Sequence, residues 1–314
     1  MPRKNSSATV ATRAPLALRL QMRMLEAVAP DRAAALAERY WFRVPPLPSA
    51  QRLARFTPPG GAPFFLMSGE SELKGESFGA PDGPLAVLVH GWGGYWQQLA
   101  AHVPALVEAG YHVVVYDAPG HGGSTHGAEG PGCGSVLEMA DAYRAVTAEL
   151  GHPALVVAHS IGAMAVLRAE RGHVPADAYV MIAPQVHLPA AIDWFAAVMG
   201  MGQRTRELFL ARLQQRVGLQ LADFDMVRDA RAMARRGPMP ALLAVHDTDD
   251  PDTPHEQTER LVAAWPGAEL MLTNSLGHRQ VIWHERVLRR VADFVARPDD
   301  GRHLHALSSE RPTG

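Results

Sequence analysis

A serine at the junction between an apolar run and a helix-forming segment is the residue best placed to do chemistry. Residues 154–158 read Ala-Leu-Val-Val-Ala, which is short and rich in β-branched residues, and residues 161–167 favour a helix. Ser160 therefore stands at a predicted turn from a strand into a helix. Such a turn can strain the backbone, expose the serine Oγ and aim the first helix amides at the group that Oγ attacks. These features make Ser160 our candidate nucleophile.

A second serine matches the short nucleophile motif more literally but lacks this context. The pattern Gly-x-Ser-x-Gly is complete around Ser77, whereas Ala158 takes the first glycine position before Ser160. The segment around Ser77 alternates like an exposed strand and runs into a turn at residues 80–84, with no helix after it. Because Ala158 is small enough for a tight turn, we favour Ser160 over Ser77.

A serine hydroxyl is a poor nucleophile and needs a base and an orienting carboxylate. His278 is the expected base, because it follows the last predicted strand and comes directly after a glycine. The run from His246 to Pro254 offers four carboxylates after another strand, and the other role open to each is turn formation or helix capping. We favour Asp250 as the orienting acid, with Asp249 as the alternative.

Two backbone N–H groups are expected to bind the negative oxygen of a tetrahedral intermediate. The N–H group of Ile161 is placed by the strand-to-helix turn itself. The second donor is expected from the loop His90-Gly91-Trp92-Gly93-Gly94, whose glycines let the backbone approach a substrate. We assign this second donor to Trp92.

Apolar runs along the chain predict the elements that must position these residues. Eight strands are expected at residues 64–68, 73–78, 85–90, 111–116, 154–158, 178–183, 241–246 and 269–273. The first two resemble an antiparallel hairpin, and the other six are continuous rather than alternating, which indicates a parallel sheet buried on both faces. Helices are expected at residues 97–108 (with Pro104 as a local defect), 135–150, 161–171, 255–265 and 283–296. The fold class is therefore α/β, with an eight-stranded, mostly parallel sheet flanked by helices.

The predicted core covers residues 49–184 and 241–297. The intervening residues 185–240 are longer than a crossover needs and predict an inserted helical lid. Residues 14–48 predict an N-terminal helical extension, and residues 1–13 and 298–314 are expected to be disordered or flexible tails. In the extension, Leu16, Leu20, Met24 and Val28 recur at intervals of four. We expect this stripe to pack on the protein itself, with membrane docking as the alternative.

Bulk properties exclude several classes of function. The formal charge of −2 gives no electrostatic footprint for nucleic acid, and the single cysteine, Cys133, excludes an internal disulfide. No apolar run approaches the roughly 18 residues that span a bilayer, and charged residues interrupt the N-terminal apolar stretch where a secretory signal would be continuous. We expect a cytoplasmic protein that does not insert into membranes. Its arginine-rich helices are compatible with a homodimer and do not require one.

Taken together, the motifs resemble the α/β-hydrolase superfamily. The resemblance rests on the order Ser160, Asp250, His278, on the loop after residues 85–90, and on the glycine-rich segment 117–124 after the next strand; it covers roughly residues 64–296. It implies that segment 117–124 supports the site structurally, and that His159 is a positioning residue. No cofactor and no metal ion is implied. Superfamily members with an aspartate nucleophile, such as epoxide hydrolases and haloalkane dehalogenases, are disfavoured by the serine.

The expected reaction is hydrolysis of a small-molecule ester through an acyl-serine, with a carboxylesterase acting on a small to medium apolar acyl group as the favoured case. Thioesterase, carbon–carbon bond hydrolase and perhydrolase chemistry stay open, as does a non-catalytic binding protein on the same fold. Apolar residues of the predicted lid are candidates either for an acyl pocket or for simple packing. These are Trp194, Phe195, Met199, Met201, Leu208 and Phe209.

Overall fold

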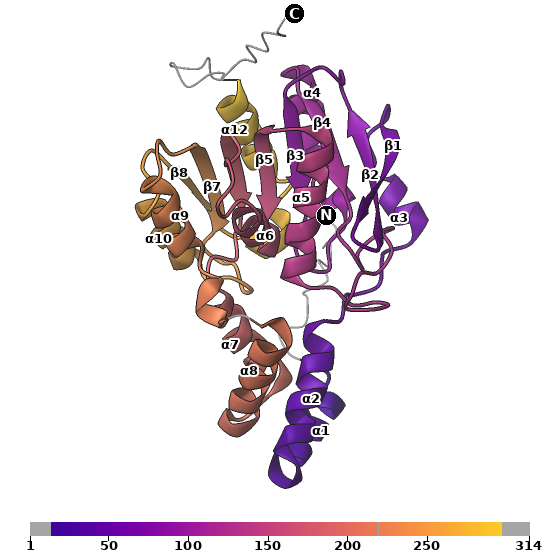
Figure 1. Cartoon of the computed structure of the whole chain (residues 1–314), viewed down its shortest axis with the longest axis vertical. Helices are drawn as coiled ribbons and strands as arrows, with labels where there is room; N and C mark the ends of the chain where they lie inside the picture. Colours follow the sequence, from indigo (N-terminus) through magenta and orange to yellow (C-terminus); the bar gives the residue numbers. More distant parts are fainter. Residues whose placement is uncertain (1–13, 219, 297–314) are drawn as a thin grey trace, which may run out of the picture.

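The computed structural model describes residues 14–218 and 220–296, so the expectations for residues 1–13 and 298–314 lie outside the described residues. Within that range the chain forms one eight-stranded sheet in the order β1-β2-β4-β3-β5-β6-β7-β8 (Figure 1). The strands are β1 Ala62–Ser68, β2 Ser71–Phe78, β3 Leu85–Val89, β4 His112–Tyr116, β5 Pro153–His159, β6 Ala178–Ile182, β7 Ala241–Asp247 and β8 Glu269–Thr273. The pairs β1·β2 and β2·β4 are antiparallel, and all the others are parallel. The predicted fold class is confirmed.

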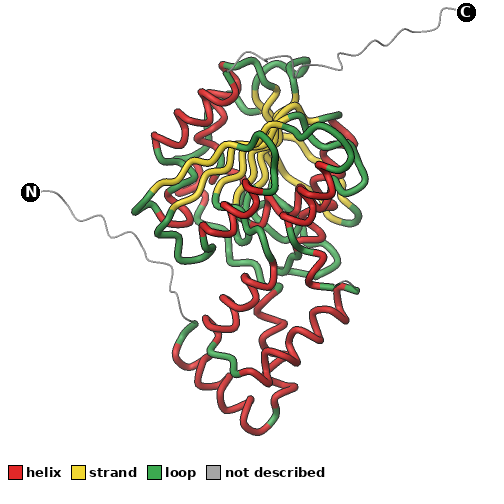
Figure 2. Tube along the Cα trace, turned by 90° about the vertical axis from the view of Figure 1, so that its left-hand side faces the viewer, coloured by secondary structure: helices red, strands yellow, loops and turns green. Residues whose placement is uncertain are grey.

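Helices cover both faces of this sheet (Figure 2). The α-helices are α1 Leu16–Val28, α2 Pro30–Trp41, α3 Ala50–Ala54, α4 Val103–Glu108, α5 Val136–Leu150, α6 Ile161–Ala169, α7 Leu188–Met199, α8 Gln203–Val217, α9 Met226–Ala234, α10 His255–Ala263, α11 Gly277–Gln280 and α12 Glu285–Val295. Alternate strand residues contribute to two separate cores. Val87 and Val89 pack in the cluster that contains α5 and α6, whereas Ala86 and Leu88 pack in the cluster that contains α4 and α12. Burial on both faces explains why these strands read as continuous apolar runs.

The edge strand β8 departs from that pattern. Leu270 and Leu272 are 36% and 39% exposed, so its outer face is open to solvent. The sequence alone gave no sign of this, because the apolar run of β8 resembles those of the inner strands.

One predicted helix is shorter than expected. Residues 97–108 were expected to form a single helix, but residues 96–98 and 100–102 form 3₁₀ turns, and α4 begins only at Val103. Pro104 lies in the first turn of α4, where the missing N–H group leaves no hydrogen bond unmade. The proline is therefore a start signal rather than a defect inside a helix.

Four helices form a layer beyond the carboxyl ends of the parallel strands: α1, α2, α7 and α8, which we call the helical cap (Figures 1 and 2). The helix α2 packs against α1 and α8, and α1 contacts α7. The aromatic rings of Trp41, Phe195 and Phe209 meet between them, with centroids 5.1 to 5.8 Å apart. In contrast, α9 contacts α6 and α10 of the core. The cap thus combines the N-terminal helices with the first part of the segment 185–240.

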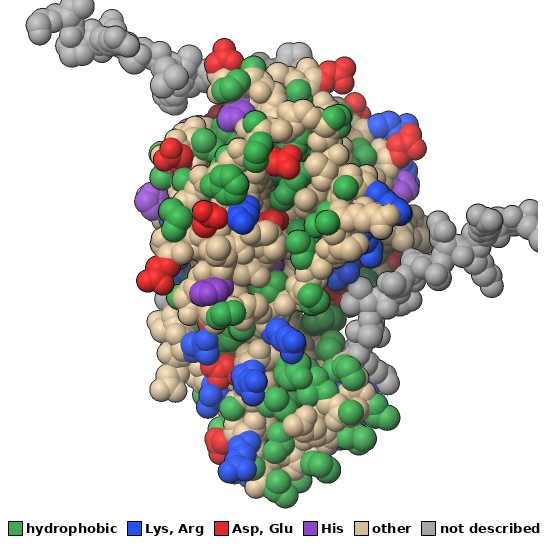
Figure 3. Space-filling view, turned by 90° about the vertical axis from the view of Figure 1, so that its right-hand side faces the viewer, with side chains coloured by type: hydrophobic (Ala, Val, Ile, Leu, Met, Phe, Trp, Pro, Cys, Tyr) green, Lys and Arg blue, Asp and Glu red, His purple; other side chains and the backbone are tan. Residues whose placement is uncertain are grey.

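The expectation that the stripe on α1 packs on the protein is wrong. Leu16, Leu20, Met24 and Val28 are 69%, 50%, 68% and 82% exposed. A second apolar set on α1, centred on the fully buried Met22, faces the protein instead. Hydrophobic side chains accordingly gather on the surface at the cap end of the molecule (Figure 3).

Candidate active site

Ser160 connects β5 to α6 in a strained turn. Its backbone has φ 54° and ψ −126°, a region that residues with a side chain rarely adopt. Hydrogen bonds hold the turn, since the Ser160 N–H group donates to Ile182 O at 3.0 Å and Ser160 O accepts from the N–H groups of Ala163 and Gln185. The expected turn is therefore present. The side chain is less open than expected, because Ser160 is only 9% exposed.

Glycine is required next to this turn because two backbones meet there. A Cβ atom at Gly162 would collide with the carbonyl oxygen of His90 at the end of β3. A Cβ atom at Gly91 would lie 2.9 Å from Cβ of Ser160 and 2.8 Å from Nδ1 of His159. The loop after β3 consequently lies directly against Ser160.

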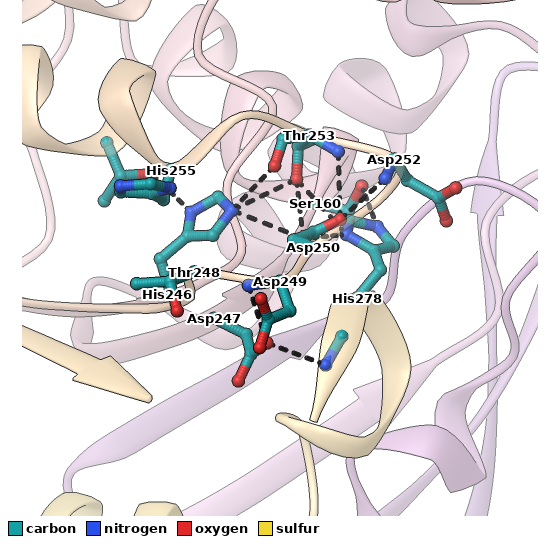
Figure 4. Close-up of polar contacts among 12 residues, drawn as sticks. Ser160, His246, Asp247, Thr248, Asp249, Asp250, Asp252, Thr253, His255 and His278 are labelled. Atoms are coloured by element: carbon teal, nitrogen blue, oxygen red, sulfur yellow. Dashed lines mark hydrogen bonds and ion pairs between the residues drawn. The ribbon is translucent and has the colours of Figure 1, made fainter. Parts of the chain in front are cut away.

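Ser160, His278 and Asp250 form one line of hydrogen bonds, although they come from three separate segments: the turn after β5, the short helix α11 and the loop after β7 (Figure 4). Nε2 of His278 lies 3.0 Å from Oγ of Ser160, and Nδ1 lies 2.7 Å from Oδ2 of Asp250. The Asp250 side chain is fully buried and that of His278 is 11% exposed. If Nδ1 of His278 carries the proton and donates it to Asp250, Nε2 is left as an acceptor for the serine hydroxyl. The arrangement can hold an imidazole ready to remove the proton of Ser160.

The carboxylate of Asp250 is kept ionised by donors on several sides. Burial by itself would raise its pKa, but hydrogen bonds from His246, His278 and the Thr253 N–H group hold the pKa well below its usual value. The Thr253 hydroxyl also donates to Oδ2 at 2.8 Å, and the Asp252 N–H group donates to Oδ1 at 2.8 Å. A permanently negative carboxylate at this point stabilises a positive charge on the neighbouring imidazole.

The other carboxylates of the same loop have different surroundings. Asp247 accepts hydrogen bonds from the N–H groups of Leu276 and Gly277 and from the Thr273 hydroxyl, and these contacts hold the start of α11, the helix that carries His278. Asp249 accepts from the Ser275 N–H group at 2.8 Å. Asp252 points away from Asp250 (Figure 4). Among the four carboxylates, Asp250 alone hydrogen-bonds His278 within the described residues, so the geometry favours it over Asp249.

His246 and Thr253 were not singled out from the sequence as site residues. Nε2 of His246 lies 3.3 Å from Oδ2 of Asp250 and 3.1 Å from Thr253 O, while its Nδ1 lies 2.6 Å from the Thr258 hydroxyl on α10. The available signal was the position of His246 at the end of β7, four residues before Asp250. Its partner Thr258 lies on α10, and tertiary packing brings the two residues together, so no local sequence pattern predicts the contact.

The two expected oxyanion donors lie on the segments that flank Ser160. The N–H group of Ile161 is the first of α6, and Trp92 follows Gly91 in the loop that touches Ser160. Within the described residues, neither N–H group donates to another backbone or side-chain acceptor. Both groups are therefore available to a bound ligand, as an oxyanion site requires.

The glycine-rich segment 117–124 packs against the loop after β3 and hydrogen-bonds to it. Asp117 accepts hydrogen bonds from the N–H groups of Trp96 and Gly123, both at 2.7 Å, and burial raises the pKa of Asp117 to about 6. Nε2 of His90 accepts from the Ala118 N–H group at 3.0 Å, and burial lowers the pKa of His90 to about 4. These contacts connect buried parts of the scaffold, in agreement with the supporting role expected for this segment.

His159 lies beside the base. Its Nε2 is 3.1 Å from the His278 carbonyl oxygen, and the two imidazole centroids are 4.7 Å apart. Burial lowers the pKa of His159 well below its usual value. A neutral His159 can donate to the His278 carbonyl without placing a second positive charge next to that ring, which is consistent with a positioning role.

Ser77 lies on β2, away from this cluster, and its hydroxyl is 3.5 Å from Ala62 O. It borders a separate hollow of about 190 Å³ that also contains Phe64 and Leu150. His112 lines the same hollow, but among the described residues no histidine forms a hydrogen bond with Ser77, although the literal motif surrounds it.

A cavity of about 330 Å³ lies between the cap helix α7 and the loop that carries Asp250. Its walls are mixed in character, with apolar surface from Ala190, Trp194, Pro251 and Pro254 and polar groups from Gln185, Asp193, Asp250 and Asp252. Of the apolar cap residues expected for an acyl pocket, Trp194 lines this cavity, whereas Phe195 and Phe209 pack against Trp41. In the part of the chain that the structure describes, no three His, Cys, Asp or Glu residues are grouped to hold a metal ion, and no helix is long and apolar enough to cross a membrane.

Comparison with known proteins assigns the chain to a family. A model of the alpha/beta hydrolase family matches residues 86–294, which include all three residues of the hydrogen-bonded line. The chain belongs to the alpha/beta hydrolase family. None of the curated proteins searched matches its sequence significantly.

Solved structures of this fold resemble the chain at low sequence identity. Carboxylesterase CesB from Bacillus subtilis is 13% identical with a TM-score of 0.57, and the match covers 86% of this chain and 99% of that protein. A bromoperoxidase from Bacillus anthracis is 19% identical with a TM-score of 0.56, covering 74% and 99%. The thioesterase domain from the curacin biosynthetic pathway is 16% identical with a TM-score of 0.54, covering 75% and 99%. At these identities the alpha/beta hydrolase fold is shared, and the different names illustrate how many reactions it supports.

Proposed function

We propose that this alpha/beta hydrolase cleaves carboxylic esters through an acyl-serine intermediate, with Ser160, His278 and Asp250 as a catalytic triad. The observation that carries the proposal is the line of hydrogen bonds from Ser160 Oγ through both nitrogens of His278 to Asp250, at 3.0 and 2.7 Å. The strained turn at Ser160 and the free N–H groups on either side support it.

In the proposed reaction, His278 removes the proton of Ser160 while Oγ attacks the carbonyl carbon of the ester. Asp250 holds the imidazole in the required tautomer and stabilises its positive charge. The N–H groups of Trp92 and Ile161 bind the oxyanion, and losing one such donor typically costs about 2.7–4 kcal/mol of transition-state stabilisation. His278 then protonates the leaving alcohol. Water, activated by the same imidazole, attacks the acyl-serine and releases the acid.

The cavity beside Asp250 supports a substrate of small to medium size. Its volume of about 330 Å³ falls at the small end of the range for ligand sites. Ala190 and Trp194 of α7 offer apolar surface for an acyl group, and Asp252 adds a carboxylate on the same wall. An uncharged acyl group suits this lining better than an anionic one, because an anion would face Asp252 without a described cationic partner in the wall.

The test is covalent labelling of the folded protein with a fluorophosphonate, followed by identification of the modified peptide by mass spectrometry. We expect the adduct on Ser160, together with hydrolysis of short-chain p-nitrophenyl esters. Ser160→Ala should remove both activities, with a loss of several orders of magnitude in kcat/KM. Ser77→Ala is the matched control and should leave them unchanged. Absence of an adduct in the folded protein would contradict the proposal and favour a binding protein on the same fold.

A further inference from the structure

We propose that the exposed apolar face of α1 docks on an anionic lipid surface, so that the helical cap attaches the protein peripherally to a membrane. The residues that form this face, called here the α1 face, are Leu16, Leu20, Met24 and Val28. They are spaced by four residues and follow the helix from its first turn to its last. A continuous apolar stripe on a surface helix marks an interaction site more often than scattered apolar residues do.

The α1 face cannot be buried by a simple rotation of the helix. On its other side, Met22 is fully buried, and the Glu26 carboxylate accepts a hydrogen bond from the Gly202 N–H group at 2.7 Å. At the start of the helix, the Ala14 N–H group donates to Val198 O at 3.0 Å. These contacts to α7 and to the start of α8 fix the orientation of α1, and they leave the α1 face outward.

The charge of the protein is distributed unequally around this face. Residues 14–48 and 185–218, which contain the cap, carry nine arginines against five acidic residues, whereas the rest of the described chain carries 15 basic and 24 acidic residues. These two segments therefore have a net charge of +4, while the described remainder has −9. Residues 1–13, which come before this part of the chain, add Arg3, Lys4 and Arg13 and no acid. The overall charge of −2 therefore does not reveal this unequal distribution of charge.

Arginines on α1, α2 and α8 are free to meet an anionic partner. Arg23, Arg32, Arg39 and Arg204 are exposed and form no ion pair with another described residue. Two exposed acids lie on these helices, Asp31 and Glu207. The other acids of the cap accept hydrogen bonds within it: Glu26, Glu38 and, on α7, Asp193. In Figure 3, Lys and Arg side chains border the hydrophobic patch at the cap end.

This combination favours an anionic lipid surface over a second copy of the chain. In a two-fold dimer through α1, the cap of one copy would face that of the other, so two surfaces of net positive charge would oppose each other. An anionic leaflet instead attracts the arginines and accepts the apolar side chains below the headgroups. Since no described helix is long enough to cross a bilayer, the contact would be peripheral.

The experiment is flotation of the full chain with vesicles of phosphatidylcholine alone or mixed with phosphatidylglycerol. We expect flotation with the anionic vesicles only, and weaker flotation as salt is raised. Leu20→Glu combined with Met24→Glu should lower partitioning by about a hundredfold, because two inserted apolar side chains become charged. Arg23→Glu should weaken binding less. Val174→Glu is the matched control, since Val174 is 76% exposed on the core, and it should bind like the unaltered protein.

The substituted α1 side chains are exposed, so the variants should fold, which circular dichroism and hydrolysis of a soluble p-nitrophenyl ester would verify. A folded protein that fails to float with anionic vesicles would overturn the proposal. Flotation that is unchanged in the Leu20→Glu, Met24→Glu variant would also overturn it. A dimer in light scattering that this variant converts to monomers, without flotation, would assign the α1 face to a second copy instead.

Discussion

Nε2 of His246 lies 3.3 Å from Oδ2 of Asp250, and both side chains are completely buried. The same oxygen lies 2.7 Å from Nδ1 of His278. One carboxylate oxygen therefore sits between two imidazoles, one on the side of Ser160 and one on the side of α10. We infer that His246 keeps Asp250 in place because its Nε2–H is shared between Asp250 Oδ2 and Thr253 O, while its Nδ1 accepts a hydrogen bond from the Thr258 hydroxyl.

Replacing His246 tests this positioning role. His246→Phe removes one of the donors that hold Oδ2 of the buried Asp250 carboxylate, which should lower kcat by about tenfold to a hundredfold. The KM for a p-nitrophenyl ester should change little, since His246 does not line the described cavity. His246→Gln can still donate toward Asp250 and should restore part of kcat. If both variants raise KM and leave kcat unchanged, His246 does not act through Asp250.

Asp250 and Asp249 can be separated by the same substitution at neighbouring positions. Asp250→Asn keeps the size of the side chain but removes the charge that stabilises the imidazolium, so kcat should fall by roughly 10⁴-fold. Asp249→Asn retains an oxygen for the Ser275 N–H group and should alter kcat only slightly. Steady-state kinetics of the two variants decides the assignment, and a larger loss for Asp249→Asn would reverse it.

The sheet was predictable because its strands are buried on both faces. Val87 and Leu88 point to opposite cores, so both positions are apolar and the run is visible in the sequence. The turn at Ser160 was predictable for a related reason, since its small neighbours reflect the close approach of His90 O to Gly162. These features can be predicted from local sequence because the burial or close contact of each residue restricts the type of that residue.

Other features depend on contacts that are distant in sequence. The sequence favoured Asp250 but kept Asp249 as an alternative, because the choice rests on which carboxylate reaches His278, 28 residues after Asp250. The orientation of α1 was mispredicted because the helix carries two apolar sets, and only the packing of Met22 decides which one faces inward. The role of His246 likewise depends on Thr258 of a separate helix.

Gly91 is expected to be essential to the shape of the site. In Gly91→Ala, the added Cβ would lie 2.8 Å from Nδ1 of His159 and 2.9 Å from Cβ of Ser160, so these groups must move. Overpacking of this kind costs about 1–3 kcal/mol, and the shift of Ser160 should also lower kcat by about tenfold or more. Gly237→Ala provides the control, because a Cβ there meets no atom within 4 Å. Thermal unfolding and ester hydrolysis measure both effects, and equal behaviour of the two variants would argue against a close contact at Gly91.

Buried histidines should make the protein sensitive to mild acid. Burial lowers the pKa of His90 and His102 to about 4 and that of His121 to about 3, against 6.5 for an ordinary histidine. Between these values the unfolded chain binds protons that the folded chain does not, so the free energy of unfolding falls as the pH drops from about 6.5 to about 4. His90 and His102 should each account for roughly 3 kcal/mol over their windows, and His121, whose pKa is lower still, for roughly 5 kcal/mol. Asp117, whose pKa is raised to about 6, acts in the opposite direction between about pH 6 and 4 and offsets part of the loss.

The contribution of a single histidine can be isolated at His102, which lies outside the site and whose Nε2 is 2.8 Å from Ile282 O. His102→Gln keeps a donor for this carbonyl but has no proton to gain in acid. Its Tm should therefore fall less steeply than that of the unaltered protein as the pH is lowered from 7 to about 4.5. Parallel Tm curves for the two proteins would show that the pKa of His102 is not lowered in the folded state, because a group with the same pKa in both states contributes no pH dependence.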